Sequence, residues 1–264
     1  MALTGLTSTL RKLQLVLHLC FVGAVALGVF SWSKLSNLPA AADIYPQSLA
    51  EPKQISISDE PFEFTYRGSS YLIEPIAEYQ LSGLVVSHND IEAFADIYHD
   101  ENSVDVKDLC VIWGDNLRSD VFHEMKFWSE PWSCWYQAPT REIHRTFSGD
   151  NLSNNHLLAS NESVRQAIME ASIGDQIQLE GKLVNYAPVS RPEWKRETST
   201  VRNDQGNGAC EVIFVDNFKI ISSFNGSWRN LHALSYRVGI FLLLAEIILF
   251  LVRTYLDAYG RTRS

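Results

Sequence analysis

The histidines are the residues of this chain whose type and spacing could support metal chemistry. His144 and His156 lie in a polar stretch with carboxylates nearby, and two imidazoles with a carboxylate can bind zinc. The segment HEMKF (123–127) has only half of a zinc-protease motif, because Phe127 occupies the position of the second histidine ligand. We therefore expect no resident metal or other cofactor. A metal-dependent hydrolase that uses His144 and His156 is the alternative.

Cysteine chemistry gives two further expectations. Cys110 and Cys134 both lie in strand-like runs, which favours a disulfide between them; buried, reduced cysteines are the alternative. Cys210 lies in GNGACEV, with Glu211 adjacent and Asp204 near. Because a reactive thiolate requires positive neighbours, we expect a structural role for Cys210.

The segment FWSEPWSCWYQ (127–137) carries the densest group of aromatic residues. Alternation along a strand would place Trp132, Cys134 and Tyr136 on one face and Trp135 on the other, between polar residues. This pattern predicts an exposed indole at Trp135, which would suit a sugar, a peptide or a protein partner. Ordinary core packing of these rings is the alternative.

Two polar segments offer further contact residues. SNNHLLAS (153–160) precedes an expected helix, and PEWKRETSTVRND (192–204) is the longest polar loop. Either segment could bind a ligand or fasten a loop to the rest of the domain. The residues that we select as contacts are Asn154, Asn155, His156 and Trp194, together with Trp132, Trp135 and Tyr136.

The elements that must position these residues are mainly strands. FEFTYRGSSYLIEP predicts a hairpin, and Asn161 can cap a helix with an apolar face. The remaining strand-like runs are 78–88, 106–114, 132–137, 175–186 and 210–221. Three strands, a helix and two strands predict a mainly β fold, an OB-like five-stranded barrel with one inserted helix. Gly83 and Gly181 fall where a small barrel bends. Another small antiparallel barrel or sandwich is the alternative.

Two apolar runs flank this domain, at 13–32 and 234–252, and each matches the length of a transmembrane helix. Glu246 lies inside the second run and His18 inside the first. Counted from the basic flanks, the two side chains have a similar depth, and polar residues in lipid usually face a partner. We therefore expect a His18–Glu246 pair. A contact of Glu246 with another membrane subunit is the alternative.

Basic residues at the outer ends of both runs favour a cytoplasmic location for the two termini: Arg11, Lys12, Arg253, Arg261 and Arg263. This predicts cytoplasmic ends at 1–12 and 253–264, a linker at 33–60 and an extracytoplasmic domain at 61–229. Cleavage of the first run near 40–42 is the alternative. The whole chain has a net charge of −9. Six of its 22 basic residues but only two of its 31 acidic residues lie in or beside the apolar runs, so the central domain is more acidic still and nucleic acid is an unsuitable partner for it.

Several segments resemble a bacterial envelope-protein family to which no activity is assigned. The similarity covers about 65–222 and is most specific in the blocks GNGACEVIFV and SNNHLL; it includes YLIEPIAEYQLSGLVVSHND, DVKDLCVIWGDNL and IGDQIQLEGKLVNY. This resemblance implies a bacterial origin and an extracytoplasmic domain.

Together these observations predict an inner-membrane protein with two spans and a periplasmic domain. Its expected function is non-enzymatic: a membrane-anchored scaffold or binding protein that contacts a membrane or periplasmic protein, or a second copy of itself. A carbohydrate- or peptidoglycan-binding module is the other binding alternative.

Overall fold

The computed structural model describes residues 2–91, 103–204 and 209–261. The chain forms two compact units. One contains residues 1–36 and 225–264, and the other contains residues 37–224.

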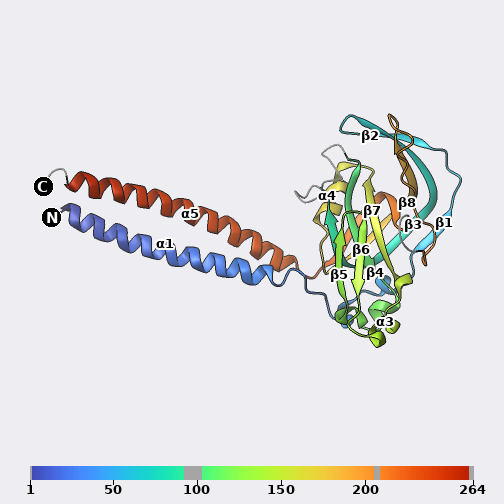
Figure 1. Cartoon of the computed structure of the whole chain (residues 1–264), viewed down its shortest axis with the longest axis horizontal. Coiled ribbons are helices and arrows are strands. Elements are labelled where there is room, and N and C mark those ends of the chain that lie inside the picture. Colours follow the sequence, from blue (N-terminus) through green and yellow to red (C-terminus); the bar gives the residue numbers. More distant parts are fainter. Residues whose placement is uncertain (1, 92–102, 205–208, 262–264) are drawn as a thin grey trace. The chain divides into compact units, whose positions relative to one another are not determined.

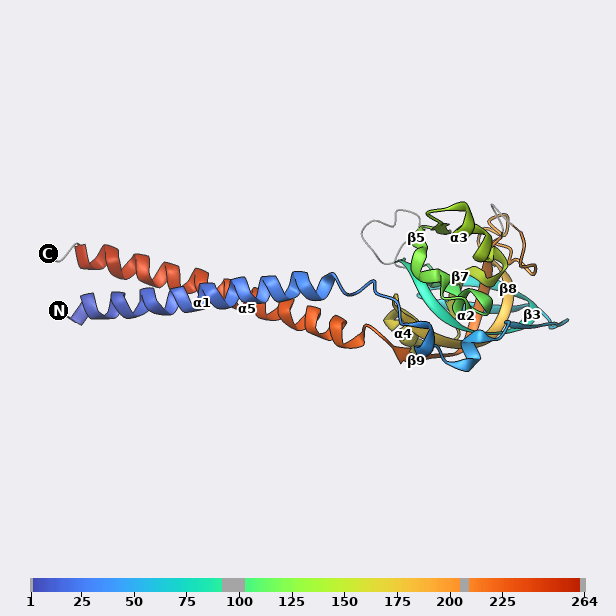
Figure 2. The same cartoon turned by 90° about the horizontal axis from the view of Figure 1, so that it is seen from below.

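The first unit is a pair of long helices. α1 (Ala2–Trp32) and α5 (Gly226–Arg261) run side by side in opposite directions (Figures 1 and 2). By length and composition, each is able to cross a membrane, over Ser8–Trp32 and Gly226–Ala258.

Small residues allow close packing of these helices around Gly28. A Cβ at Gly28 would lie 3.1 Å from the Ser235 hydroxyl oxygen, and His232 Nδ1 lies 3.0 Å from the Gly28 carbonyl oxygen. Phe30 packs edge-on against Trp228, with 5.7 Å between ring centroids. Backbone approach at a small residue is a general way for apolar helices to associate.

The second unit is built on a mixed sheet of seven strands. Its order is β1-β3-β4-β7-β9-β8, and β2 pairs with β3 beside this path. The strands are β1 (Lys53–Ser56), β2 (Phe62–Tyr66), β3 (Ser69–Asp90), β4 (Asp105–Ile112), β7 (Leu152–Ala159), β8 (Asp175–Pro188) and β9 (Glu211–Ser223).

The strand pairings form a closed circuit because β3 has two partners. The C-terminal part of β3 pairs with β4, and its longer N-terminal part pairs with β8, so the path β3-β4-β7-β9-β8 returns to β3. β7 and β9 are parallel, and the other pairings in the circuit are antiparallel. Register shifts at Pro75/Ala77 and Val85/Ser87 bend β3 between its partners.

Glycine is required where strands cross closely. A Cβ at Gly181 would lie 2.2 Å from the Phe214 carbonyl oxygen, and a Cβ at Gly83 would lie 2.6 Å from the Ile112 carbonyl oxygen. Both glycines were predicted to lie at bends. Each lets one strand approach the backbone of its neighbour.

One face of the circuit encloses the larger core. Every strand of the circuit contributes a fully buried side chain, namely Leu81, Leu109, Leu157, Ile177, Leu179 and Ile213. α4 (Glu162–Glu170) packs Val164 and Ile168 into the same core. Asn161 caps this helix as predicted, because its side chain accepts a hydrogen bond from Val164 N.

The opposite face of the sheet is covered by a separate two-stranded hairpin. β5 (Lys126–Glu130) and β6 (Ser133–Gln137) pair only with each other among the described residues. Their inner residues join a second core with β3 and β4: Phe127, Cys134 and Tyr136 pack with Leu84, Val86, Cys110 and Ile112. The short helical segments are α2 (Asp115–Arg118), α3 (Arg141–Thr146), and 3₁₀ turns at Ala41–Asp43, Pro46–Leu49, Val121–Glu124 and Gly149–Asn151.

This arrangement corrects two expectations. The segment 132–137 is not the third strand of the main sheet, because Trp132 lies in the hairpin turn with φ of 68° and the rest forms β6. The third strand of the circuit, after β3 and β4, is β7. The segment 153–160 was expected as a polar loop. It forms a buried strand instead, because its polar side chains have hydrogen-bond partners on neighbouring elements.

The expected linker at 33–60 is largely part of the folded domain. β1 pairs with β3, Gly114 N donates to the Ser48 carbonyl oxygen, and Ile44 is buried in the second core. Single residues of this segment make these contacts, and its apolar residues do not recur at a helix or strand period. The hydrophobic pattern of the sequence therefore did not predict that the segment is folded.

We predict that Gly181→Ala destabilises the β-rich unit by about 1–3 kcal/mol, because the new methyl group meets backbone that cannot move without breaking strand pairing. Thermal unfolding of the full chain in detergent, followed by circular dichroism, measures this effect. Gly23→Ala is the matched control, since a Cβ there meets nothing within 4 Å. Equal unfolding of both variants and wild type would contradict the close approach.

Candidate functional site

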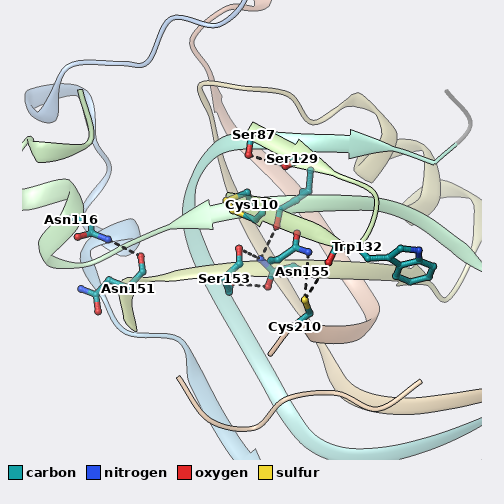
Figure 3. Close-up of a disulfide and its surroundings, with 12 residues drawn as sticks. Ser87, Cys110, Asn116, Ser129, Trp132, Asn151, Ser153, Asn155 and Cys210 are labelled. Atoms are coloured by element: carbon teal, nitrogen blue, oxygen red, sulfur yellow. Dashed lines mark hydrogen bonds between the residues drawn. A yellow bond between two sulfur atoms is a disulfide. The ribbon is translucent and has the colours of Figure 1, made fainter. Parts of the chain in front are cut away.

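The hairpin is covalently attached to the main sheet. The structure contains the predicted disulfide between Cys110 on β4 and Cys134 on β6, with a Cα–Cα distance of 5.7 Å (Figure 3). A two-stranded hairpin alone is marginally stable in water, so this attachment matters for its order.

Polar contacts fasten the hairpin at further points. Ser129 and Ser87 share a hydrogen bond of 2.8 Å between their hydroxyl oxygens (Figure 3). Trp132 N donates to Asp108 Oδ2 over 3.3 Å, and Cys210 Sγ donates to the Trp132 carbonyl oxygen over 3.6 Å. The hairpin therefore contacts β3, β4 and Cys210, the residue that precedes β9.

Beneath the hairpin turn lies a polar cluster, which we call the His156 cluster: Asp108, Trp132, His156, Arg196 and Cys210. His156 Nδ1 lies 2.6 Å from Asp108 Oδ1, and His156 Nε2 lies 2.9 Å from Arg196 Nη2. The His156 and Asp108 side chains are 0% and 1% exposed. The Trp132 ring lies 5.2 Å from the imidazole, and the Arg196 guanidinium lies 4.7 Å from the Trp132 ring.

Opposing effects act on the His156 imidazole. Burial is the largest single effect and lowers the pKa of His156, but the Asp108 carboxylate and Cys210 together raise it to about 10. The Arg196 contact acts against protonation, because a guanidinium N–H can donate only to an unprotonated Nε2. Charge and geometry therefore oppose each other at this imidazole: the Asp108 carboxylate favours the protonated form, whereas the Arg196 contact favours a neutral ring that accepts at Nε2.

The His156 cluster has the residue types of a thiol active site, but both imidazole nitrogens already have partners, Asp108 at Nδ1 and Arg196 at Nε2. Cys210 also lies close enough to the imidazole to raise its pKa. His144 lies on α3 and is exposed, in contrast to the buried His156. Within the described ranges, no group of three His, Cys, Asp or Glu side chains could hold a metal ion.

Glu211 and Asp204 were expected to lie beside the Cys210 thiol, but the structure gives it other neighbours. Glu211 forms an ion pair of 2.9 Å with Arg202, whereas Cys210 contacts Trp132 and Asn154. Successive residues of a strand point to opposite faces, so adjacency in sequence did not reveal the neighbours of the thiol.

The asparagines of β7 are structural rather than exposed. Asn155 is fully buried and donates to the Leu109 carbonyl oxygen over 3.0 Å, and Asn154 donates to Cys210 Sγ over 3.6 Å. With His156, they were expected to form a contact surface. Their burial shows instead that they join β7 to β4 and β9.

The outer face of the hairpin carries an exposed aromatic pair. Trp128 and Trp135 lie directly opposite each other on β5 and β6, stacked with 6.3 Å between centroids and 17° between planes. They are 40% and 47% exposed. We define this hairpin face as the two indoles and their outward polar neighbours Lys126, Glu130, Ser133 and Gln137.

The exposed Trp135 was predicted from alternation, whereas Trp128 was not selected. The polar and apolar residues of KFWSE do not alternate, so Trp128 could be placed only from the pairing of β5 with β6, which sets it opposite Trp135. Tyr136 points inward and packs against Phe147 at 4.9 Å. Trp194 lies in the β8–β9 loop, 63% exposed, under the Arg191 guanidinium at 4.7 Å.

The helical unit brings the two expected intramembrane residues together. His18 Nδ1 lies 3.5 Å from Glu246 Oε1. Arg253 donates to Gln14 Oε1 nearer the ends of the helices. Side-chain polar contacts between α1 and α5 therefore occur at the end that contains both chain termini, in addition to the His232–Gly28 contact at the other end.

A second buried carboxyl lies apart from the hairpin. Burial raises the pKa of Glu211 to about 7, although the paired Arg202 guanidinium acts in the opposite direction. Arg202 also donates to the Tyr79 hydroxyl over 3.2 Å and lies over the Tyr79 ring. This group joins the β8–β9 loop to the core.

No protein-family model, curated protein or solved structure matches this chain. The similarity to a bacterial envelope family therefore stays a prediction, and the geometry of the site carries the functional argument.

We predict that Asp108→Asn destabilises the protein by about 3–5 kcal/mol, because it removes the buried carboxylate that pairs with the fully buried His156 and orients it toward Arg196. Chemical denaturation of the full chain in detergent measures the change. Asp120→Asn is the control, since its carboxylate is 56% exposed and also neighbours a histidine. A loss no larger than that of the control would show that the cluster does not stabilise the fold.

Glu211 generates a pH prediction. Its folded-state pKa of about 7 exceeds the ordinary value of 4.5, so between these values the folded state keeps a proton that the unfolded state releases. The free energy of unfolding should therefore fall as pH rises from about 4.5 to 7. Melting temperatures across this window should decline less in Glu211→Gln than in wild type.

The control for this pH prediction is Glu74→Gln, because the pKa of Glu74 is lowered by its hydrogen bond with Lys195. That variant should keep the wild-type slope. An unchanged slope in Glu211→Gln would contradict the prediction.

Proposed function

We propose that this protein is a non-enzymatic, membrane-anchored binding protein of the bacterial inner membrane. Two helices of spanning length, with basic residues at the ends nearest the chain termini, support cytoplasmic termini and a periplasmic location for residues 37–224. The disulfide supports the same location, since such bonds persist in oxidising compartments.

The proposed architecture of the periplasmic unit is an OB-like barrel. Support comes from the circuit β3-β4-β7-β9-β8, from its parallel β7–β9 pair, and from the position of α4 between β7 and β8. This is the strand order of a five-stranded Greek-key barrel with a helix after its third strand.

OB folds often bind their ligands on the face of the second and third strands. Here those strands are β4 and β7, and the hairpin inserted between them in sequence covers that face. The outer surface of the hairpin therefore replaces the usual binding surface of the fold.

The observation that carries the proposal is the aromatic pair. Two indoles that are 40% and 47% exposed lie on a hairpin that a disulfide and three polar contacts hold in place. Tryptophan is enriched among residues that dominate binding energy, and a fixed side chain loses little entropy on binding. The partner we propose is a membrane or periplasmic protein that docks on the hairpin face.

A carbohydrate of the cell wall is the second candidate ligand. The two indole planes differ by 17° and are flanked by carboxylate, amide and hydroxyl groups. The negative face of an aromatic ring attracts the weakly positive C–H groups of a sugar, while the flanking groups can bond its hydroxyls.

We predict that Trp135→Ala and Trp128→Ala each remove most partner recovery without unfolding the domain. In-cell cross-linking followed by detergent purification and mass spectrometry identifies the partner. Met169→Ala is the control, because Met169 is a similarly exposed apolar residue on α4. Equal recovery from all variants would refute the hairpin face as the contact surface.

The same purified variants distinguish the two ligand classes. Retention of wild type on isolated wall fragments, with loss in Trp135→Ala, would assign the face to carbohydrate. Absence of wall binding by wild type, together with a cross-linked protein that depends on Trp135, would assign it to a protein partner.

A further inference from the structure

The helical unit contains a polar cavity at the end that holds both chain termini. The cavity has a volume of about 260 Å³ and is lined by Arg11, Gln14, Leu15, His18, Glu246 and Arg253. Five of these six side chains are polar or charged, although the surrounding helices are apolar enough to span a membrane. Such residues in a membrane helix require a partner.

The charges in this cavity are not balanced. Among the described residues, neither Arg11 nor Arg253 forms an ion pair, and the one carboxylate, Glu246, lies beside His18. Arg253 uses one N–H group to donate to Gln14 Oε1, which leaves other donors of the guanidinium for a ligand. The cavity therefore has a net positive charge at its Arg11–Arg253 end.

The depth of these groups fits the layers of a bilayer. Arg11 precedes the apolar run of α1, and Arg253 follows that of α5, so both guanidiniums lie where lipid phosphates lie. His18 and Glu246 lie roughly two helical turns deeper, at about 1.5 Å per residue. An anion would bind at the arginine end, because the Glu246 carboxylate repels it from the deeper end.

We propose that this cavity binds the headgroup phosphate of an anionic phospholipid between α1 and α5. Arg11 and Arg253 contact the phosphate oxygens, since the planar guanidinium matches phosphate geometry with paired N–H donors. Gln14 orients the Arg253 side chain, and the His18–Glu246 pair closes the inner end of the cavity. The proposal requires that α1 and α5 span a membrane, but it is independent of the hairpin face.

The test is lipid binding by the full chain in detergent, measured by native mass spectrometry with phosphatidylglycerol and phosphatidylcholine as probes. Wild type should bind phosphatidylglycerol in clear preference to phosphatidylcholine. Arg11→Gln and Arg253→Gln should each weaken phosphatidylglycerol binding by about five-fold, the effect of one cation at the membrane surface. Arg253→Lys should weaken it less, because the charge remains and only the paired donors are lost.

Lys12→Gln is the matched control, since it removes a positive charge beside Arg11 but outside the cavity lining. This variant should keep wild-type binding. Equal weakening by Lys12→Gln would show general attraction and overturn the site, as would equal affinity for both lipids. Binding of inorganic phosphate in place of the lipid would also overturn it. Carbonate extraction tests membrane spanning separately.

Discussion

The attachment of the β5–β6 hairpin to the main sheet is the constraint on which the proposed site depends. Two strands alone cannot bury enough surface to stay ordered. The Cys110–Cys134 disulfide joins them to β4, and apolar side chains on their inner face complete the second core. The indoles on the outer face gain a fixed position only because the inner face is held this way.

The His156 cluster beneath the turn extends this attachment with polar contacts. Buried polar groups destabilise a protein unless they find partners, and here the partners come from different elements. His156 on β7 joins Asp108 on β4 to Arg196 in the β8–β9 loop, and Asp108 also accepts from the hairpin at Trp132. The cluster therefore connects four parts of the domain, so its integrity and the position of the hairpin are coupled.

Elements that are determined by a few neighbouring residues were predicted correctly from the sequence. The turn at Arg67–Gly68 follows from glycine, the α4 cap from Asn161, and the terminal helices from their apolar runs. β7 could not be recognised in this way, because Asn155 and His156 look like loop residues until their partners on β4 are known. The Cys110–Cys134 disulfide was favoured from two strand-like runs, and its formation required the hairpin to lie against β4.

Some residues of the candidate site could likewise be predicted from local sequence, whereas others could be placed only once the fold was known. Alternation along 132–137 identified the exposed Trp135, but pairing in register was needed to place Trp128 beside it. The contact residues expected in β7 proved to be internal. Depth counting brought His18 to Glu246, whereas the cavity they share with two arginines required both helices in position.

The most direct test of the central claim is amide hydrogen–deuterium exchange of the full chain, with and without the disulfide. We compare oxidised wild type with the Cys110→Ser/Cys134→Ser double variant, following residues 126–137, 152–159 and 211–223. The account predicts faster exchange in 126–137 of the variant, while the other two segments stay protected. Unchanged protection of 126–137 would show that the hairpin does not depend on its covalent attachment. It would remove the basis for a disulfide-fixed binding face.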